Sequence, residues 1–204
     1  MKNGHLIACA ICFFVFGFSS SIIGPTIEDI AQGIGVSLVI VGLLRSGRQF
    51  GQAIGYFKFG KSADQTDLRT IATCGAILKA FGLASMSVGS MVVMLAASVF
   101  WGLGHSIFNL APNVVVGRAL GKDAHSTLIL LHGVYGVGSI VGPLVVELLR
   151  PYGFQSIYLF TSVLVLRALN HLNVNQPRQQ SAPAPNYQNG RPWPARRRLR
   201  LDER

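Results

Sequence analysis

The chain has 204 residues, of which 50% are hydrophobic and 13% are charged, whereas an average soluble domain carries about 25% charged residues. This composition excludes an ordinary water-soluble globular domain. The formal net charge is +10, but half of it comes from the last stretch, Asn173 to Arg204, so the basic balance does not indicate nucleic-acid binding.

Six stretches are apolar and long enough to cross a bilayer, for which a helix needs about 20 residues. They predict an all-α membrane protein whose six transmembrane helices form one bundle over residues 1–172. Residues 173–204 are rich in Pro, Gln, Asn and Arg, which predicts a disordered basic tail. The stretches, called segments one to six, are Leu6–Ile23, Ser37–Phe59, Thr70–Gly89, Met91–Val116, Ser126–Leu149 and Gln155–Leu172.

Segment one has the position of a secretory signal, but it lacks a small-residue cleavage site and five similar segments follow it. We therefore interpret it as a membrane anchor. It contains Cys9 and Cys12 at the spacing of a redox or metal pair. With no second pair in the sequence, we favour small apolar filler over a metal site. The connection after it carries Glu28 and Asp29 and no basic residue.

Segment two has a polar face and a glycine face. The polar residues recur with helical spacing and share one face: Arg45, Arg48, Gln49 and Gln52. The glycines recur every fourth residue: Gly47, Gly51 and Gly55. Ionisable groups at membrane depth are costly and mark candidate functional sites, whereas small residues at this spacing let two helices approach closely. We expect a wet cavity beside the polar face and a helix beside the glycines. Alternatively, Arg45 or Arg48 pairs structurally with Glu147 or with a carbonyl.

Segments three to five add further polar residues. Lys79 lies in the middle of segment three, either facing the cavity or reaching toward the membrane surface. Segment four has amides and a histidine on one face, with a proline expected to kink the helix: His105, Asn109, Pro112 and Asn113. Amides suit hydroxyl-bearing ligands, but they also join helices by hydrogen bonds. Segment five places His132 and Tyr135 on one face; His132 is either a proton carrier or a neutral hydrogen-bonding residue.

Basic residues concentrate in every second connection between segments. Lys61 and Arg69 follow segment two, Arg118 and Lys122 follow segment four, and the arginine-rich tail follows segment six. By the positive-inside rule, this pattern places both termini in the cytoplasm. We expect a multi-pass protein of the cell (inner) membrane.

The sequence contains no nucleotide-binding or catalytic motif of the P-loop, HExxH or GxSxG type. Ser106 follows His105 directly, but neighbours on a helix point about 100° apart and do not form a nucleophile–base pair. We therefore expect no enzymatic activity, no cofactor and no metal.

Three regions carry a family resemblance. The loop with Gly60, Asp64 and Arg69 is similar to the GxxxD-(R/K)-x-G-(R/K)-(R/K) motif, although Asp67 stands where glycine is usual. Segment four is similar to a glycine-rich helix with spaced polar residues, and segment five to a His-x-x-(aromatic)-Gly-x-Gly helix. Over residues 6–172 the chain resembles the N-terminal six-helix half of the major facilitator superfamily, in its fucose-permease-like branch.

The resemblance implies a transporter of two six-helix halves that rock about a solute held between them. It implies transport of a small polar solute, sugar-like or an organic anion, by alternating access, with the loop of Gly60, Asp64 and Arg69 as a gate. Together with the polar faces, it gives these candidate substrate-binding residues: Arg45, Arg48, Gln49, Gln52, His105, Asn109, Asn113, His132 and Tyr135.

Segment six supports an alternative. It contains Arg167, Asn170 and His171, which leave an apolar core of about 10 residues, Ile157–Leu166, where a span needs about 20. On this interpretation the chain is a truncated, non-transporting half-transporter or a membrane partner subunit. A third interpretation is that a homodimer, or a separate second six-helix half, rebuilds the complete cavity.

Overall fold

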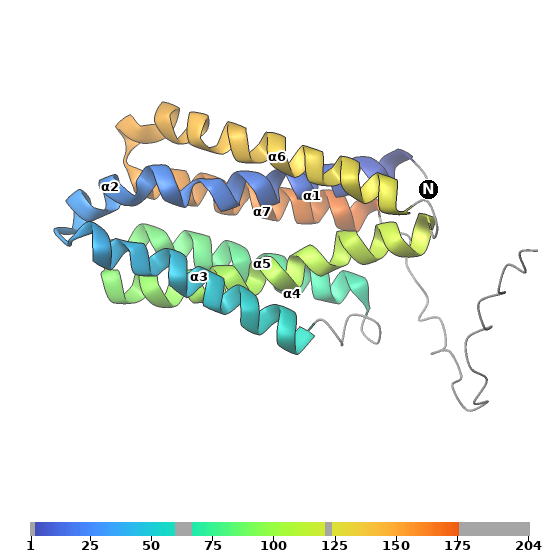
Figure 1. Cartoon of the computed structure of the whole chain (residues 1–204), viewed down its shortest axis with the longest axis horizontal. Coiled ribbons are helices and arrows are strands. Elements are labelled where there is room, and N and C mark those ends of the chain that lie inside the picture. Colours follow the sequence, from blue (N-terminus) through green and yellow to red (C-terminus); the bar gives the residue numbers. More distant parts are fainter. Residues whose placement is uncertain (1–2, 60–66, 121–123, 176–204) are drawn as a thin grey trace, which may run out of the picture.

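The computed structural model describes residues 3–59, 67–120 and 124–175 (Figure 1). Within these ranges the chain is helical with short turns and no strand, which confirms the predicted all-α fold. The helices are α1 (Asn3–Ser21), α2 (Ile23–Ile34), α3 (Leu38–Phe59), α4 (Leu68–Ser85), η2 (Met86–Val88), α5 (Met91–Leu120), α6 (Ala124–Leu149), η4 (Arg150–Tyr152) and α7 (Phe154–Asn175).

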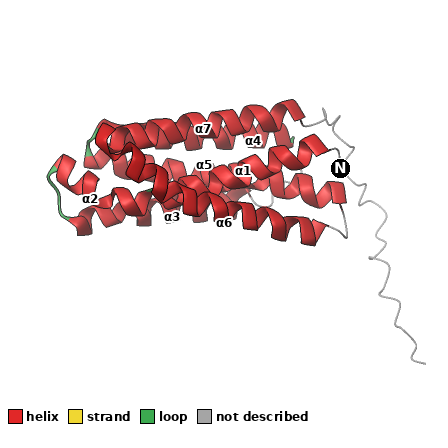
Figure 2. Cartoon of the chain, turned by 90° about the horizontal axis from the view of Figure 1, so that it is seen from above, coloured by secondary structure: helices red, strands yellow, loops and turns green. Residues whose placement is uncertain are grey.

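The long helices run back and forth, so the start of α1 and the end of α7 lie at the same end of the bundle (Figure 1). Their main contacts join them in the order α6, α1, α7, α4, α5 and α3. Further contacts of α1 and α6 with α5 close this series into a bundle (Figure 2). Its centre is filled by buried aromatic side chains: Phe13, Phe16, Trp101, Phe108 and Tyr158.

Five helices of the described chain are long and apolar enough to cross a membrane: α1, α4 with η2, α5, α6 with η4, and α7. α3 is not among them, because its polar face dilutes its apolar residues. The predicted count of six transmembrane helices is therefore one too high by this measure. α3 has 22 residues and packs along α5 within the bundle, so its polarity, not its length or position, sets it apart.

The expectation of a short apolar core in segment six was wrong. α7 is a continuous helix of 22 residues, and Phe154–Val174 is long and apolar enough to span a membrane. Arg167 and Asn170 lie on its exposed side, where they do not interrupt packing against α4 and α1.

The connection after segment one is mostly helical. α1 and α2 follow each other with one interruption, at Ile22. Pro25, in the first turn of α2, has no N–H for the carbonyl of Ser21, and its ring clashes with that carbonyl; this accounts for the break. α2 ends at Gly35, whose φ of 67° is the left-handed conformation typical of a glycine at a helix C-terminus.

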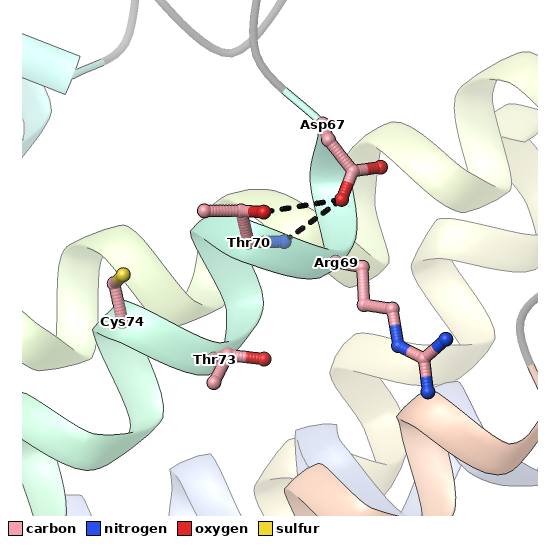
Figure 3. A pocket seen from close by; sticks show the side chains of 5 residues that line it. All are labelled: Asp67, Arg69, Thr70, Thr73 and Cys74. Atoms are coloured by element: carbon pink, nitrogen blue, oxygen red, sulfur yellow. Dashed lines mark hydrogen bonds between the residues drawn. The ribbon is translucent and has the colours of Figure 1, made fainter. Parts of the chain in front are cut away.

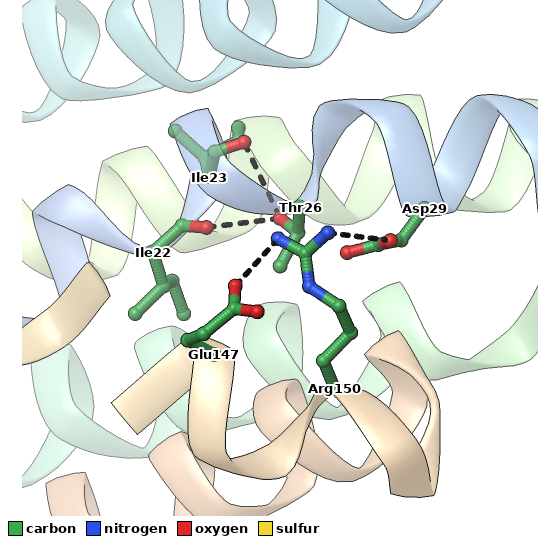
Figure 4. Close-up of polar contacts among 6 residues, drawn as sticks. All are labelled: Ile22, Ile23, Thr26, Asp29, Glu147 and Arg150. Carbon is green, nitrogen blue, oxygen red and sulfur yellow. Dashed lines mark hydrogen bonds and ion pairs between the residues drawn. The ribbon is translucent and has the colours of Figure 1, made fainter. Parts of the chain in front are cut away.

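Arg150 joins α2 to the end of α6 (Figure 4). Its guanidinium lies 3.6 Å from the Asp29 carboxylate and 3.0 Å from the Glu147 carboxylate. In the described part of the chain, Glu147 therefore pairs with Arg150, and not with Arg45 or Arg48 as the alternative for segment two proposed.

The glycine repeat of segment two is confirmed as a helix contact. A Cβ added to Gly51 would collide with the carbonyl oxygen of Val99 on α5. The flanking glycines Gly47 and Gly55 would meet Ser98 and Ser106 of the same helix. The small residues thus let the α3 backbone rest directly on α5.

Two residues of the predicted gating loop, Gly60 and Asp64, lie outside the described residues, as does the tail from residue 176. Arg69 is exposed in the first turn of α4. Asp67 caps this helix: its carboxylate accepts hydrogen bonds from the backbone N–H and the hydroxyl of Thr70, each at 3.2 Å (Figure 3). The residue that departs from the family motif thus has a structural role.

Candidate functional site

Arg48 lies at a junction of three helices, with 7% of its surface exposed. Its Nη2 donates a hydrogen bond to Ser20 Oγ on α1 at 2.9 Å. Its Cζ lies 4.9 Å from the centre of the Trp101 ring on α5, within range of a cation–π contact. Gly102 allows this approach, because a Cβ there would collide with the Arg48 carbonyl.

Two N–H donors at this junction have no hydrogen-bond partner among the described residues: Arg48 Nε and Trp101 Nε1. An unpaired buried donor costs about 1–3 kcal/mol, and more when the group is charged. None of the carboxylates in the described chain pairs with Arg48. They are Glu28, Asp29, Asp67 and Glu147. The junction therefore offers positive charge and free donors to a solute that brings oxygen acceptors.

The other polar residues of α3 extend this site toward the surface. Arg45 and Gln49 are exposed and Gln52 is half-buried, while Arg48 on the same face is buried. The face thus runs from an exposed rim to a buried cation. Tyr56, one turn beyond Gln52, continues it and connects it to α5.

The two asparagines of α5 behave differently. Asn109 Nδ2 donates to the hydroxyl of Tyr56 at 3.0 Å and so joins α5 to α3. Asn113 Nδ2 donates to the Asn109 carbonyl at 2.7 Å and to Asn109 Oδ1 at 3.2 Å, within its own helix. The helix continues through Pro112. Asn109 therefore makes an interhelical hydrogen bond, and both amides are half-buried.

On α6, Tyr135 is half-buried and, like Tyr56, lies within electrostatic range of Arg48. His132 is exposed; its Nδ1 lies 2.8 Å from the Leu128 carbonyl, and its ring packs edge-on against Phe13. The structure thus brings Tyr135 toward Arg48, whereas His132 contacts its own helix and α1.

His105 stands apart from this group. It is 4% exposed, and its Nδ1 lies 3.1 Å from Lys79 Nζ on α4, on another side of α5 from Asn109 and Tyr56. The expectation that Lys79 reaches the cavity or the membrane surface was wrong, because Lys79 is fully buried on His105.

Sequence reasoning did not select Ser20, Trp101 or Tyr56. Ser20 belongs to a run of three serines in an apolar helix, and Tyr56 lies four residues after Gln52 on the polar face. The sequence therefore contained a reason to select both Ser20 and Tyr56 as candidate site residues. It contained none for Trp101, because a tryptophan in an apolar helix is equally typical of core or lipid contact.

A hollow of about 280 Å³ lies at the start of α4, lined by Asp67, Arg69, Thr70, Thr73 and Cys74 (Figure 3). It is wide open. Since Asp67 is engaged in capping and Thr73 accepts a hydrogen bond from Asn173 at 3.4 Å, we assign it no solute.

Residues 9–203 match the profile of the Major Facilitator Superfamily. The chain belongs to this superfamily. As a major facilitator with several membrane-length helices, it is an integral multi-pass membrane protein, as predicted.

The relatives of this major facilitator include two curated proteins of low identity. It is 26% identical over 171 residues to Bypass of stop codon protein 6 of Saccharomyces cerevisiae, which covers 78% of this chain and 33% of the yeast protein. It is 24% identical over 149 residues to Sodium-dependent glucose transporter 1 of Danio rerio, which covers 71% of this chain and 25% of that protein. The chain thus spans about a third or less of the length of these relatives.

Proposed function

We propose that this chain takes part in moving a small polar solute, a sugar or an organic anion, across a membrane by alternating access. Within the superfamily we assign it to the fucose-permease-like branch, as a counterpart of the N-terminal six-helix half. We place it in the cell (inner) membrane with both ends of the chain in the cytoplasm, supported by the alternation of basic residues between connections.

The observation that carries the proposal is the state of Arg48. A buried guanidinium without a carboxylate partner in the described chain, beside a second free N–H donor, costs free energy unless a ligand uses it. A guanidinium offers up to two parallel hydrogen bonds to a carboxylate, and it also donates to hydroxyl oxygens. Arg48 and Trp101 would therefore hold the solute from the buried side of the site.

The remaining candidates surround this centre. Arg45, Gln49 and Gln52 would contact the solute from the exposed rim of α3, and Tyr135 from α6. Asn109 and Asn113 would offer amides from α5, with His132 at the margin. The name of the zebrafish relative supports a sugar, whereas the unbalanced charge of Arg48 supports an anion.

We also propose that a second bundle completes the site. The polar rim formed by Arg45 and Gln49 is exposed in the isolated chain, and α6 shows large apolar side chains on its surface, among them Ile140 and Leu144. A second copy of this chain or a separate six-helix chain would cover both, and the loop of Gly60, Asp64 and Arg69 would gate the assembled cavity. The mass of the detergent-solubilised full-length protein distinguishes one chain from two.

The site can be tested with its own tryptophan. The chain has two tryptophans, Trp101 and Trp193, so the full-length Trp193→Phe variant keeps one indole, 4.9 Å from the Arg48 Cζ. Purified protein is titrated with D-glucose, L-fucose and D-gluconate, and the Trp101 emission is followed. D-glucose and D-gluconate share a carbon skeleton and differ in the carboxylate, so their comparison separates a sugar site from an anion site.

We expect a saturable emission change that Arg48→Gln weakens roughly 10- to 100-fold, since a hydrogen bond to a charged group contributes about 1.5–3 kcal/mol. Arg167→Gln, which removes an exposed arginine of α7, is the matched control and should bind normally. Unchanged binding in Arg48→Gln would remove Arg48 from the site. Uptake by proteoliposomes then separates a transporter from a partner that binds a solute without moving it.

A further inference from the structure

Lys79 and His105 form an enclosed pair in the centre of the bundle. Lys79 Nζ lies 3.1 Å from His105 Nδ1 and 4.8 Å from the centre of the Phe16 ring. Phe16 also packs edge-on against the imidazole, with ring centres 5.3 Å apart. Lys79 has 0% exposed surface and His105 has 4%. The pair is thus closed in by α1, α4 and α5.

No carboxylate of the described chain balances this pair. Asp67 is the acidic residue on the same helix, but it lies about 18 Å away along α4 and caps its first turn. Arg150 holds the carboxylates of Asp29 and Glu147 at an end of the bundle. The pair therefore has no buried anion to stabilise two positive charges.

The titratable groups that act on the pair come from two neighbouring helices. Arg48 faces it from α3, and Cys12 faces it from α1. On α7, Tyr158 is engaged with Thr26, 2.9 Å away, and its charge interaction is with Arg48. One of these neighbours, Arg48, is a second cation, which adds to the cost of charging both nitrogens of the pair.

Chemistry and geometry leave one kind of ligand. The pair has almost no exposed surface to offer a solute, whereas a proton binds directly to a lone pair of either nitrogen. With one proton added, the ammonium of Lys79 donates to the Nδ1 lone pair of His105, and the face of Phe16 stabilises the charge. With two added, Nδ1 carries an N–H of its own, the hydrogen bond is lost, and two positive charges stand 3.1 Å apart.

We propose that Lys79 and His105 form one proton-binding site that takes up and releases a single proton as a unit. On release, an N–H bond of the ammonium breaks, its electron pair stays on Nζ, and the proton passes to a water molecule that reaches the pair when the bundle opens. The neutral amine and the neutral imidazole then remain hydrogen-bonded. On uptake, these steps reverse.

This proton lies next to the solute site. Gly102 of α5 rests on the backbone of Arg48, and Gly104, two residues on, rests on the backbone of Lys79. The backbones of the two cationic residues therefore flank a single turn of α5. The consequence rests on the proposed function: a proton on the pair adds to the charge of Arg48, so proton uptake and anion binding at Arg48 strengthen each other equally.

The test titrates protons alone, on the full-length protein in lipid nanodiscs without solute. The chain has five histidines, and the His105 Nδ1 signal in [15N]histidine-labelled protein is identified by its loss in His105→Gln. Lys79 Nζ is followed in the same way in [15N]lysine-labelled protein, with Lys79→Met for assignment. We expect both nitrogens of the native pair to report one common titration midpoint.

Each variant also serves as a reciprocal test. Lys79→Met should move the His105 midpoint by about one pH unit or more, and His105→Gln should move that of Lys79 similarly, since coupled sites titrate as a pair. Lys58→Met, which removes an exposed lysine at the end of α3, should move neither. Separate midpoints in the native protein, or a midpoint that ignores loss of the partner, would overturn the proposal. If the shared midpoint is found but none of D-glucose, L-fucose and D-gluconate binds at Arg48, the proposed function fails and the proton site stands.

Discussion

Replacing Gly51 by alanine should separate the two helices that hold the candidate site. Gly51 lies between Arg48 and Gln52 on α3, and its added Cβ would collide with the carbonyl oxygen of Val99 on α5. The obstructing atom belongs to the backbone of a helix, so no side-chain rotation relieves the collision. α3 must move away from α5, and Arg48 must move with it.

The size of the effect follows from two opposing contributions. Alanine in a helix interior is favoured over glycine by about 1 kcal/mol. Forcing an extra methyl group into a packed contact costs about 1–3 kcal/mol, and occasionally more. Gly42, also on α3, supplies the matched control, because nothing lies within 4 Å of its added Cβ. Gly42→Ala therefore has the helix-forming advantage of alanine without the steric collision. The free energies of unfolding of the two variants should differ by about 1–3 kcal/mol.

Thermal unfolding in detergent measures this difference through buried thiols. Cys9 and Cys12 are buried and react with a maleimide dye only on unfolding, whereas Cys74 is exposed and is replaced by serine in all proteins compared. At about 2–4 °C per kcal/mol for a chain of this size, Gly51→Ala should melt several degrees below Gly42→Ala. Equal melting temperatures would mean that α3 and α5 are not in backbone contact at Gly51, and the geometry of Arg48 would need revision.

Two further substitutions are checked by the same melting assay. Asp67→Ala removes the cap of α4 and should cost about 1 kcal/mol, whereas Asp67→Ser keeps an acceptor for the Thr70 N–H and should cost less; equal losses would contradict the capping role. Tyr158→Phe removes a buried hydroxyl 2.9 Å from Thr26 Oγ1 and should cost about 1 kcal/mol, while Tyr152→Phe, at an exposed tyrosine, should change nothing.

Helical periodicity predicted the two faces of α3 because both depend on local spacing. The glycines were expected to meet another helix, and they do. The arginines and glutamines were expected on one face, and their exposure grades from buried Arg48 to exposed Arg45 and Gln49. A spacing of 3.6 residues per turn fixes which residues share a face, so this part of the fold was accessible from the sequence.

Hydropathy alone misjudged two helices for opposite reasons. α3 carries a polar face, so a count of apolar stretches overstated its fitness to span a membrane. α7 contains Arg167 and Asn170, but both lie on the exposed side, so counting them as interruptions understated it. A linear window averages over all sides of a helix, and it does not record on which side a charge lies.

Periodicity also does not say which neighbour a face meets. His105, Asn109 and Asn113 recur every fourth residue, but each step turns about 40° around the helix. His105 contacts Lys79 on α4, whereas Asn109, four residues further along, contacts Tyr56 on α3. Residues grouped by spacing were therefore divided between the core and the candidate site, and this division needed the tertiary packing.

Burying a charge is costly, so both Arg48 and Lys79 are candidate functional residues. Their surroundings differ, however, and favour different ligands. Arg48 keeps an unused N–H beside the unused N–H of Trp101, and its helix face continues to exposed polar residues. Lys79 has an acceptor in His105, an aromatic face in Phe16 and no exposed surface. Unused donors beside an open face fit a solute, whereas an internal acceptor in a closed site fits a proton. Because a single turn of α5 lies between the backbones of the two cationic residues, a change of charge on one must alter the binding free energy at the other.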